Sequence, residues 1–186
     1  AVLANGPELA TLFLAATCSC VFAPLNPTLT AAELEYELAH YGCTCLVLAH
    51  DEARAVFAET AARLGIRVLR LTPSEAEAGV FEMTAEAATD DDHRTVSIND
   101  ARREDVALLL HTSGTTAKPK SIPLTHRHLG SGAVALMSTL RRTRDDVCIN
   151  VMPLFHIHGQ IVNVLGTLAV GASVVCTPGF GDPVDF

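Results

Sequence analysis

Across residues 1–71, short apolar runs alternate with longer segments whose apolar residues recur at helical spacing. The short runs are bounded by Gly, Pro or polar residues and predict strands over residues 1–4, 20–23, 44–48 and 66–71. The periodic segments predict helices over residues 7–16, 31–41 and 51–64. Because strands that alternate with helices build parallel sheets, we predict an α/β fold: a layered parallel or mixed sheet flanked by helices.

Three of the predicted helices begin at residues that are suited to capping. Asn5 or Gly6 can cap the first helix, and Thr125 can cap the helix that runs to Leu140. Thr30 stands three residues before Glu33, which is the spacing of a capping box. Gly42 is suited to end the same helix, because glycine adopts the left-handed conformation without strain.

An acidic segment, residues 72–104, interrupts the alternation. It is poor in large apolar residues, which predicts a solvated connection with short elements in preference to an acidic metal site. Beyond it, the pattern predicts strands over residues 106–110, 121–124, 146–151 and 172–176, and helices over 125–140 and 161–170. We predict one incomplete domain over residues 1–186, with βα repeats (1–71), an acidic connection (72–104) and a C-terminal part (105–186).

Charge and composition restrict the classes of function. A formal net charge of −8 argues against a nucleic-acid partner, because phosphate backbones require a basic face. No apolar run reaches the roughly 18 residues of a membrane span. The start of the chain lacks the pattern of a signal peptide. It also lacks an initiator Met and begins within a predicted strand, which indicates a fragment or a chain whose first segment is not shown. We expect the six cysteines to be small buried residues of a reduced, cytoplasmic protein, since Cys-x-Cys is not the usual zinc spacing.

The chemistry of the chain is concentrated in residues 108–120, where an apolar run gives way to hydroxyl groups, a glycine and two lysines. Loops at strand ends bind ligands in α/β sheets, and hydroxyl donors beside Lys118 and Lys120 suit a polyphosphate. Gly114 lets the backbone approach such a ligand closely. A Walker A loop would need a second glycine directly before Lys-Ser/Thr, and this loop has none there.

The loop instead resembles the phosphate-binding signature of the adenylate-forming (AMP-binding) superfamily, which reads approximately Thr-Ser-Gly-Thr-Thr-Gly-x-Pro-Lys-Gly. Residues 112–116, Pro119 and Lys120 match this signature, whereas Ala117 and Ser121 stand where the family usually has glycine. If the first of these positions requires a positive φ, alanine costs about 1 kcal/mol there.

Further blocks resemble the same family in the expected order. They are Asn-Gly-Pro-Glu-Leu at 5–9, Pro-Leu-Asn-Pro at 24–27 with the helix start at 30–34, Leu-Thr-His at 124–126 and Pro-Leu-Phe-His-Ile-His-Gly at 153–159. The last block and the His-Thr-Ser-Gly-Thr-Thr run look most like the oxalate–CoA ligase-like branch of the acyl-CoA synthetases. The family's adenine block, ribose-binding Asp, hinge and late catalytic Lys are absent. The resemblance therefore covers part of the large N-terminal region.

The resemblance implies a two-step ligase. A carboxylate substrate attacks the α-phosphate of ATP, and a thiol of CoA or of a carrier-protein pantetheine then displaces AMP. Thr115 and Lys120 are the implied catalytic residues, Mg²⁺ accompanies the nucleotide, and His156 lines the acyl pocket. The residues implied to bind the ATP phosphates are Thr112, Ser113, Gly114, Thr115, Thr116, Ala117 and Lys120.

Other interpretations remain open at this point. His156 and His158 could pair at a metal, but zinc needs more ligands, so we predict no metal site and a packed His158. His126 and His128 are expected to be structural. The chain could instead be a non-catalytic nucleotide-binding or interaction module, or an adenylation domain that loads a carrier protein. Alone it is expected to be inactive, with an open sheet edge through which it can self-associate.

Overall fold

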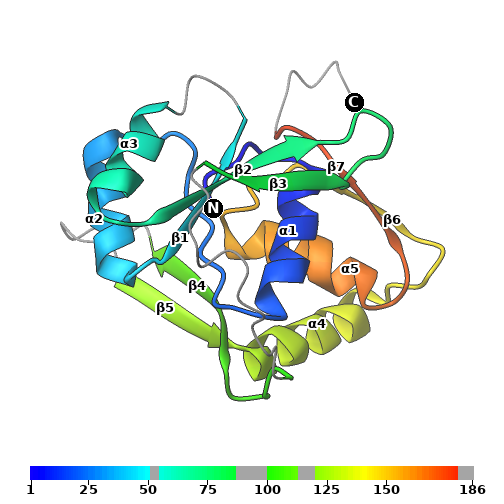
Figure 1. Cartoon of the computed structure of the whole chain (residues 1–186). Helices are drawn as coiled ribbons and strands as arrows, with labels where there is room; N and C mark the ends of the chain where they lie inside the picture. Colours follow the sequence, from blue (N-terminus) through cyan, green and yellow to red (C-terminus); the bar gives the residue numbers. More distant parts are fainter. Residues whose placement is uncertain (51–54, 87–99, 113–119, 180–186) are drawn as a thin grey trace. The chain divides into compact units, whose positions relative to one another are not determined.

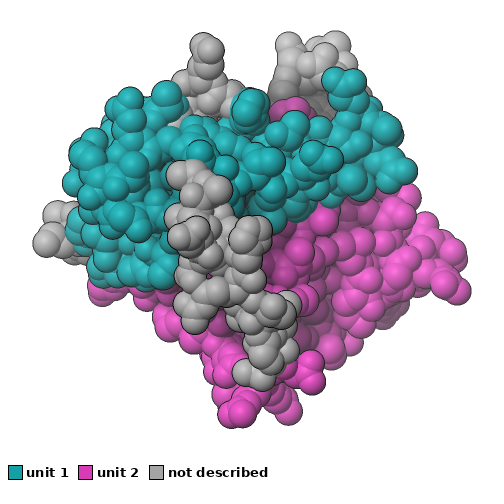
Figure 2. All heavy atoms as spheres, viewed as in Figure 1, with its two compact units in different colours: residues 1–4, 25–98 teal, residues 5–24, 99–186 magenta. Residues whose placement is uncertain are grey.

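Two units divide the chain (Figure 2). Unit 1 comprises residues 1–4 and 25–98, and unit 2 comprises residues 5–24 and 99–186. The computed structural model describes residues 1–50, 55–86, 100–112 and 120–179. Its strands pair in both parallel and antiparallel fashion and are accompanied by helices, which confirms the predicted mixed α/β class.

Unit 1 contains a three-stranded sheet and two helices (Figure 1). Its elements are α2 (Ala31–Tyr41), β1 (Cys45–Ala49), α3 (Ala55–Arg63), β2 (Arg67–Pro73) and β3 (Phe81–Ala85). Strand β1 lies parallel to β2, as the alternation of strands and helices predicts. Strand β3 runs antiparallel to β2 and lies within the acidic segment. Most of its side chains are exposed, so its pairing depends on the backbone and leaves little hydrophobic signal in the sequence.

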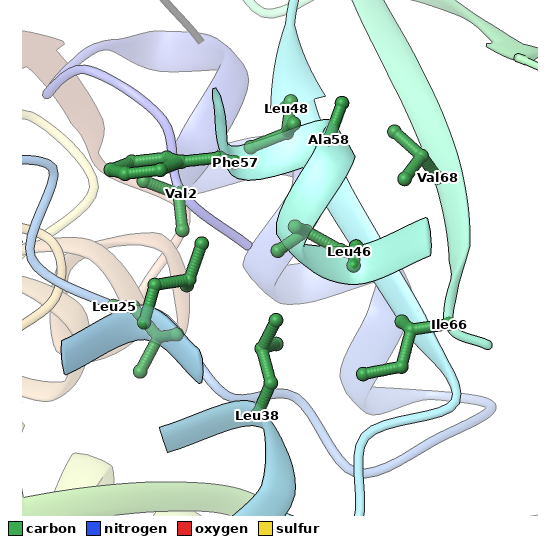
Figure 3. Packing of buried hydrophobic residues seen from close by; sticks show 11 residues of the cluster. Val2, Leu25, Leu38, Leu46, Leu48, Phe57, Ala58, Ile66 and Val68 are labelled. Carbon is green, nitrogen blue, oxygen red and sulfur yellow. The ribbon is translucent and has the colours of Figure 1, made fainter. Parts of the chain in front are cut away.

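The core of unit 1 is built from both helices, β1, β2 and the segments that precede them (Figure 3). Its buried residues are Val2, Leu25, Leu34, Leu38, Leu46, Leu48, Phe57, Ala58, Ala61, Ile66 and Val68. Val2 joins the sheet only through an isolated parallel bridge to Leu48. The strand predicted over residues 1–4 is therefore wrong, because a single bridge does not extend the sheet.

The predicted ends of α2 are confirmed. The carboxylate of Glu33 accepts the backbone N–H of Thr30 at 2.8 Å, and the Thr30 hydroxyl accepts the backbone N–H of Glu33 at 3.3 Å. These hydrogen bonds favour the ionised carboxylate, so the pKa of Glu33 lies below its ordinary value. Gly42 ends the helix in the left-handed region with φ 61°.

Unit 2 contains an antiparallel strand pair, a parallel strand pair and several helices. Its elements are α1 (Pro7–Thr17), β4 (Val106–Thr112), β5 (Lys120–Thr125), α4 (His126–Leu140), β6 (Val147–Asn150), η3 (His158–Leu165), α5 (Gly166–Leu168) and β7 (Ser173–Cys176). The strand predicted over residues 20–23 is reduced to a bridge between Phe22 and Leu108. The helix predicted over 161–170 begins earlier, as the π-helix η3, a form that is often found at functional sites.

The prediction of buried cysteines is wrong. Cys18, Cys20 and Cys45 are exposed, the other three are half-buried, and none forms a disulfide. Partial burial raises the pKa of the Cys20, Cys43 and Cys176 thiols, which keeps them protonated at neutral pH. Within the described residues, every helix is too short or too polar to cross a bilayer.

Candidate functional site

Strands β4 and β5 form an antiparallel hairpin in which Thr112 is paired with Lys120 (Figure 1). Lys120 is the first residue of β5 and is exposed. The connecting residues 113–119 lie outside the described residues, and with them the predicted phosphate ligands Ser113, Gly114, Thr115, Thr116 and Ala117. The hairpin thus holds both ends of the predicted phosphate loop in register and leaves the Lys120 side chain accessible to a ligand.

The hairpin is anchored on its buried strand. Ala107 and Leu108 of β4 are fully buried. The backbone of Phe22 pairs with β4 from the other side, with hydrogen bonds of 2.9 Å to the carbonyl of Ala107 and 2.8 Å from the N–H of Leu109. Pro123 faces Leu109 from β5, which fits an edge strand, because proline has no N–H to donate to a further neighbour. The base of the loop is therefore held by hydrogen bonds on both sides of β4.

This geometry differs from that of a Walker A loop. A Walker A loop leads directly into a helix whose N-terminus meets the phosphates. Here the loop returns as strand β5, and helix α4 begins only at His126. The strand–loop–strand arrangement agrees with the missing glycine and sets this loop apart from P-loop enzymes.

His156 lies in the loop between β6 and η3. Its backbone N–H donates to the carbonyl of Pro153 at 3.1 Å, and its ring Nδ1 accepts the backbone N–H of His158 at 3.2 Å. A neutral imidazole whose Nδ1 accepts a hydrogen bond carries its proton on Nε2. Because His156 is exposed, this Nε2–H can donate to an anionic ligand.

Two further histidines that the sequence singled out, His158 and His128, have different surroundings. His158 is exposed, so the prediction that it is packed is wrong. The ring Nδ1 of His128 accepts the backbone N–H of Thr125 at 3.0 Å and completes the capping box of α4, a structural role as expected. Among the described residues, no three His, Cys, Asp or Glu side chains come together as a metal site.

Side-chain amides hold the start of the His156 loop. Asn150 donates to the carbonyl of Met152 at 3.1 Å, and Asn163 of η3 donates to the side-chain oxygen of Asn150 at 2.8 Å. Asn150 is fully buried, where an unpaired amide would be costly. Sequence reasoning missed these residues, because an asparagine at a strand end is more often a turn residue.

Asn5 also has a role that the sequence did not indicate. The residue that caps α1 is Gly6, without a side-chain cap, so the Asn5 side chain does not serve the helix. Its Oδ1 accepts the backbone N–H of Leu154, and its Nδ2 donates to the carbonyl of Thr177. The only sequence signal for a role of Asn5 was its place in the family block at residues 5–9. That block was interpreted as the start of a helix.

Gly159 permits the first turn of η3 to approach the loop that contains His156. A Cβ at this position would lie 2.5 Å from the carbonyl oxygen of Pro153 and 3.2 Å from that of Met152. The first distance is shorter than any ordinary contact, so no larger residue fits without movement of the backbone.

Gln160 is fully buried, and neither atom of its side-chain amide has a hydrogen-bond partner within the described part of the chain. An unpaired buried amide costs about 1–3 kcal/mol. We therefore expect Gln160→Met, which keeps the length of the side chain, to raise the free energy of unfolding by about 1 kcal/mol. Urea denaturation measures this change. A lower stability in the variant would contradict the prediction and would indicate that the amide binds a buried group.

A cavity of about 400 Å³ lies in unit 2 beside the C-terminal end of α1. Its lining includes Cys18, Cys20, Arg102, Asp105 and His126. Neither Lys120 nor His156 lines it.

The whole chain, residues 1–186, matches the family described as AMP-binding enzyme. The chain therefore belongs to this family, which confirms the resemblance found in its loop and in its Phe-His block.

Several relatives of this chain are named as CoA ligases. An oxalate–CoA ligase from Arabidopsis thaliana is 34 % identical over 171 residues, which cover 91 % of this chain and 33 % of that protein. A mitochondrial malonate–CoA ligase from Homo sapiens is 32 % identical over 160 residues, which cover 86 % of this chain and 26 % of that protein. The crystal structure of ATP-bound MatB from Rhodopseudomonas palustris superposes with a TM-score of 0.75 at 30 % identity, over 94 % of this chain and 33 % of that one. The chain thus spans between about a quarter and a third of the length of these relatives.

Proposed function

We propose that the protein to which this chain belongs activates a carboxylic acid with ATP and transfers the acyl group to CoA. The observation that carries the proposal is the β4–β5 hairpin. It brings Thr112 and Lys120, the two ends of the phosphate signature, into direct pairing and leaves Lys120 exposed. Membership of the AMP-binding family supports the same chemistry.

In the first step, a carboxylate oxygen of the substrate bonds to the α-phosphorus of ATP. The bond from that phosphorus to the bridging oxygen breaks, and pyrophosphate leaves with the electron pair. We assign to the loop the task of holding the β- and γ-phosphates. The ammonium group of Lys120 and the hydroxyl group of Thr115 offset the negative charge that develops on the leaving group, which is the kind of electrostatic stabilisation that lowers such barriers most.

His156 orients the substrate in this proposal. Its Nε2–H, set by the hydrogen bond at Nδ1, donates to the substrate carboxylate and holds one oxygen ready for attack. In the second step, the CoA sulfur bonds to the acyl carbon, the acyl–oxygen bond breaks and AMP leaves, while the thiol proton passes to solvent.

Mg²⁺ is expected to accompany ATP, because it is usually bound by phosphates with only one or two carboxylates. The metal would add positive charge at the phosphates. The described residues of this chain offer no cluster of metal ligands of their own, so the role we assign to the chain is to bind the phosphates.

The substrate class that we favour is a short dicarboxylic acid. The support comes from relatives named for oxalate and malonate, and from the sequence blocks that resemble the same branch. Those relatives are named as CoA ligases, which favours CoA over a carrier protein as the acceptor. We keep a cytoplasmic location as part of the proposal, although the human relative is named as mitochondrial.

ATP–pyrophosphate exchange tests the proposal in the longer protein that contains this chain. We expect exchange to require an added acid and to be faster with oxalate or malonate than with ferulate or a long-chain fatty acid. Thioester formation should then require CoA. If no acid supports exchange while calorimetry shows tight binding of ATP, the non-catalytic alternative is correct. If exchange occurs but only a carrier protein accepts the acyl group, the adenylation-domain alternative is correct.

A further inference from the structure

Asn5 joins three segments of unit 2 that are far apart in the sequence. Its Nδ2 donates to the carbonyl of Thr177, and its Oδ1 accepts the backbone N–H of Leu154, each at 2.8 Å. The sequence separations are 172 and 149 residues. Both sides of the amide are therefore used, and both partners are backbone groups.

The partner Leu154 lies at the centre of the turn that presents His156. The turn is closed by the hydrogen bond from the His156 N–H to the Pro153 carbonyl, and Leu154 stands between these two residues. The turn belongs to no strand, so side chains, and not a sheet ladder, fix its position. Leu154 is only 1 % exposed, and this burial of its side chain anchors the turn in unit 2.

We propose that Asn5 is a positioning residue for His156. Its amide fixes Leu154, and through the turn it sets the direction of the His156 Nε2–H. The inference rests on the proposed function, because that function places the substrate carboxylate at His156. Asn5 would thereby act in the reaction although it lies near the N-terminal end of the chain, far in sequence from the His156 loop.

The choice of asparagine follows from the two partners. One partner is a donor and the other is an acceptor, and a primary amide supplies both functions at one carbon. In Asn5→Asp, the carboxylate still accepts the Leu154 N–H but faces the Thr177 carbonyl without a proton to share. In Asn5→Ala, both bonds are lost. We expect the effect on His156 to increase in that order.

The signal of the His156 ring gives a test that does not depend on activity. The longer protein is labelled at histidine Cε1, and the His156 signal is assigned by its loss in His156→Ala. We expect Asn5→Ala and Asn5→Asp to shift this signal. The matched control is Asn26→Ala in unit 1, which removes two hydrogen bonds to Thr28, each 2.9 Å long, and should leave the signal in place. An unshifted His156 signal in folded Asn5→Asp would overturn the proposal.

A double-mutant cycle separates positioning from a merely structural role. We expect Asn5→Ala to lower kcat/KM for the acid about 10- to 100-fold in the wild-type background, as a misplaced catalytic geometry does. In the His156→Ala background, it should change kcat/KM by less than about twofold. An equal loss in both backgrounds would overturn the proposal. Absence of exchange with every acid would reject the proposed function instead, and the histidine signal would still decide the role of Asn5.

Discussion

Replacement of Lys120 by alanine is expected to lower kcat for ATP–pyrophosphate exchange about 10²- to 10³-fold in the longer protein. The reason is the negative charge that develops on the leaving pyrophosphate, part of which the ammonium group of Lys120 offsets in the proposed mechanism. The hairpin fixes the backbone of Lys120 opposite Thr112. A cationic side chain elsewhere in the chain is therefore not expected to take the place of the Lys120 ammonium group. Steady-state exchange at saturating ATP measures the change.

Lys118→Ala is a matched control, since Lys118 and Lys120 are the only two lysines in the chain. Both variants remove one positive charge from the same loop, but the family signature leaves the position of Lys118 open. We therefore expect a smaller loss in Lys118→Ala. Lys120→Arg keeps the charge but replaces a compact ammonium group with a planar fork, and should restore only part of the activity. Equal losses in both alanine variants would show that total charge, and not the position of Lys120, is what matters.

The elements that the sequence predicted well are those with local signals. Helices α2 and α4 have hydroxyl caps at Thr30 and Thr125, and each cap bonds to a residue three positions further along the chain. Strand β4 is a continuous apolar run that ends at the hydroxyl-rich loop, and the structure ends it at Thr112. These features depend on neighbours in the sequence, so a single sequence contains the information that specifies them.

The parts that the sequence did not predict depend on distant partners. The Asn5 side chain meets Leu154 and Thr177 only after the chain has folded, and nothing near Asn5 indicates either partner. The π-helix η3 begins before the predicted helix, because Gly159 allows the chain to pass close to the Pro153 carbonyl. The motif comparison located His156, but only the structure shows which groups orient its ring.

The predicted site has two parts, the His156 turn and the phosphate loop, and the structure describes them to different extents. Around His156, the hydrogen bonds of the described residues define a donor and the network that holds it. At the phosphate loop, the structure gives the two ends, and the roles of Ser113 to Ala117 remain predictions from the family signature.

Gly159→Ala should have a large effect on the turn that presents His156. The added methyl group would stand 2.5 Å from the Pro153 carbonyl oxygen, so either that carbonyl or the start of η3 must move. The Pro153 carbonyl also accepts the His156 N–H, so its displacement alters the turn that presents His156. We expect the free energy of unfolding to fall by about 1–3 kcal/mol, as for other overpacked sites. Urea denaturation measures this loss, and a shift of the His156 ring signal reports the movement of the turn.

Gly130→Ala separates this steric effect from the general consequence of replacing glycine. Gly130 lies in α4, and a Cβ there meets no atom within 4 Å. Alanine should therefore stabilise the helix by about 0.5–1 kcal/mol, because it loses less conformational freedom on folding than glycine does. The two variants add the same methyl group to the same unit, yet we expect opposite signs. If Gly159→Ala were as stable as Gly130→Ala and left the His156 signal unchanged, close approach of η3 to the Pro153 carbonyl could not be what orients this loop.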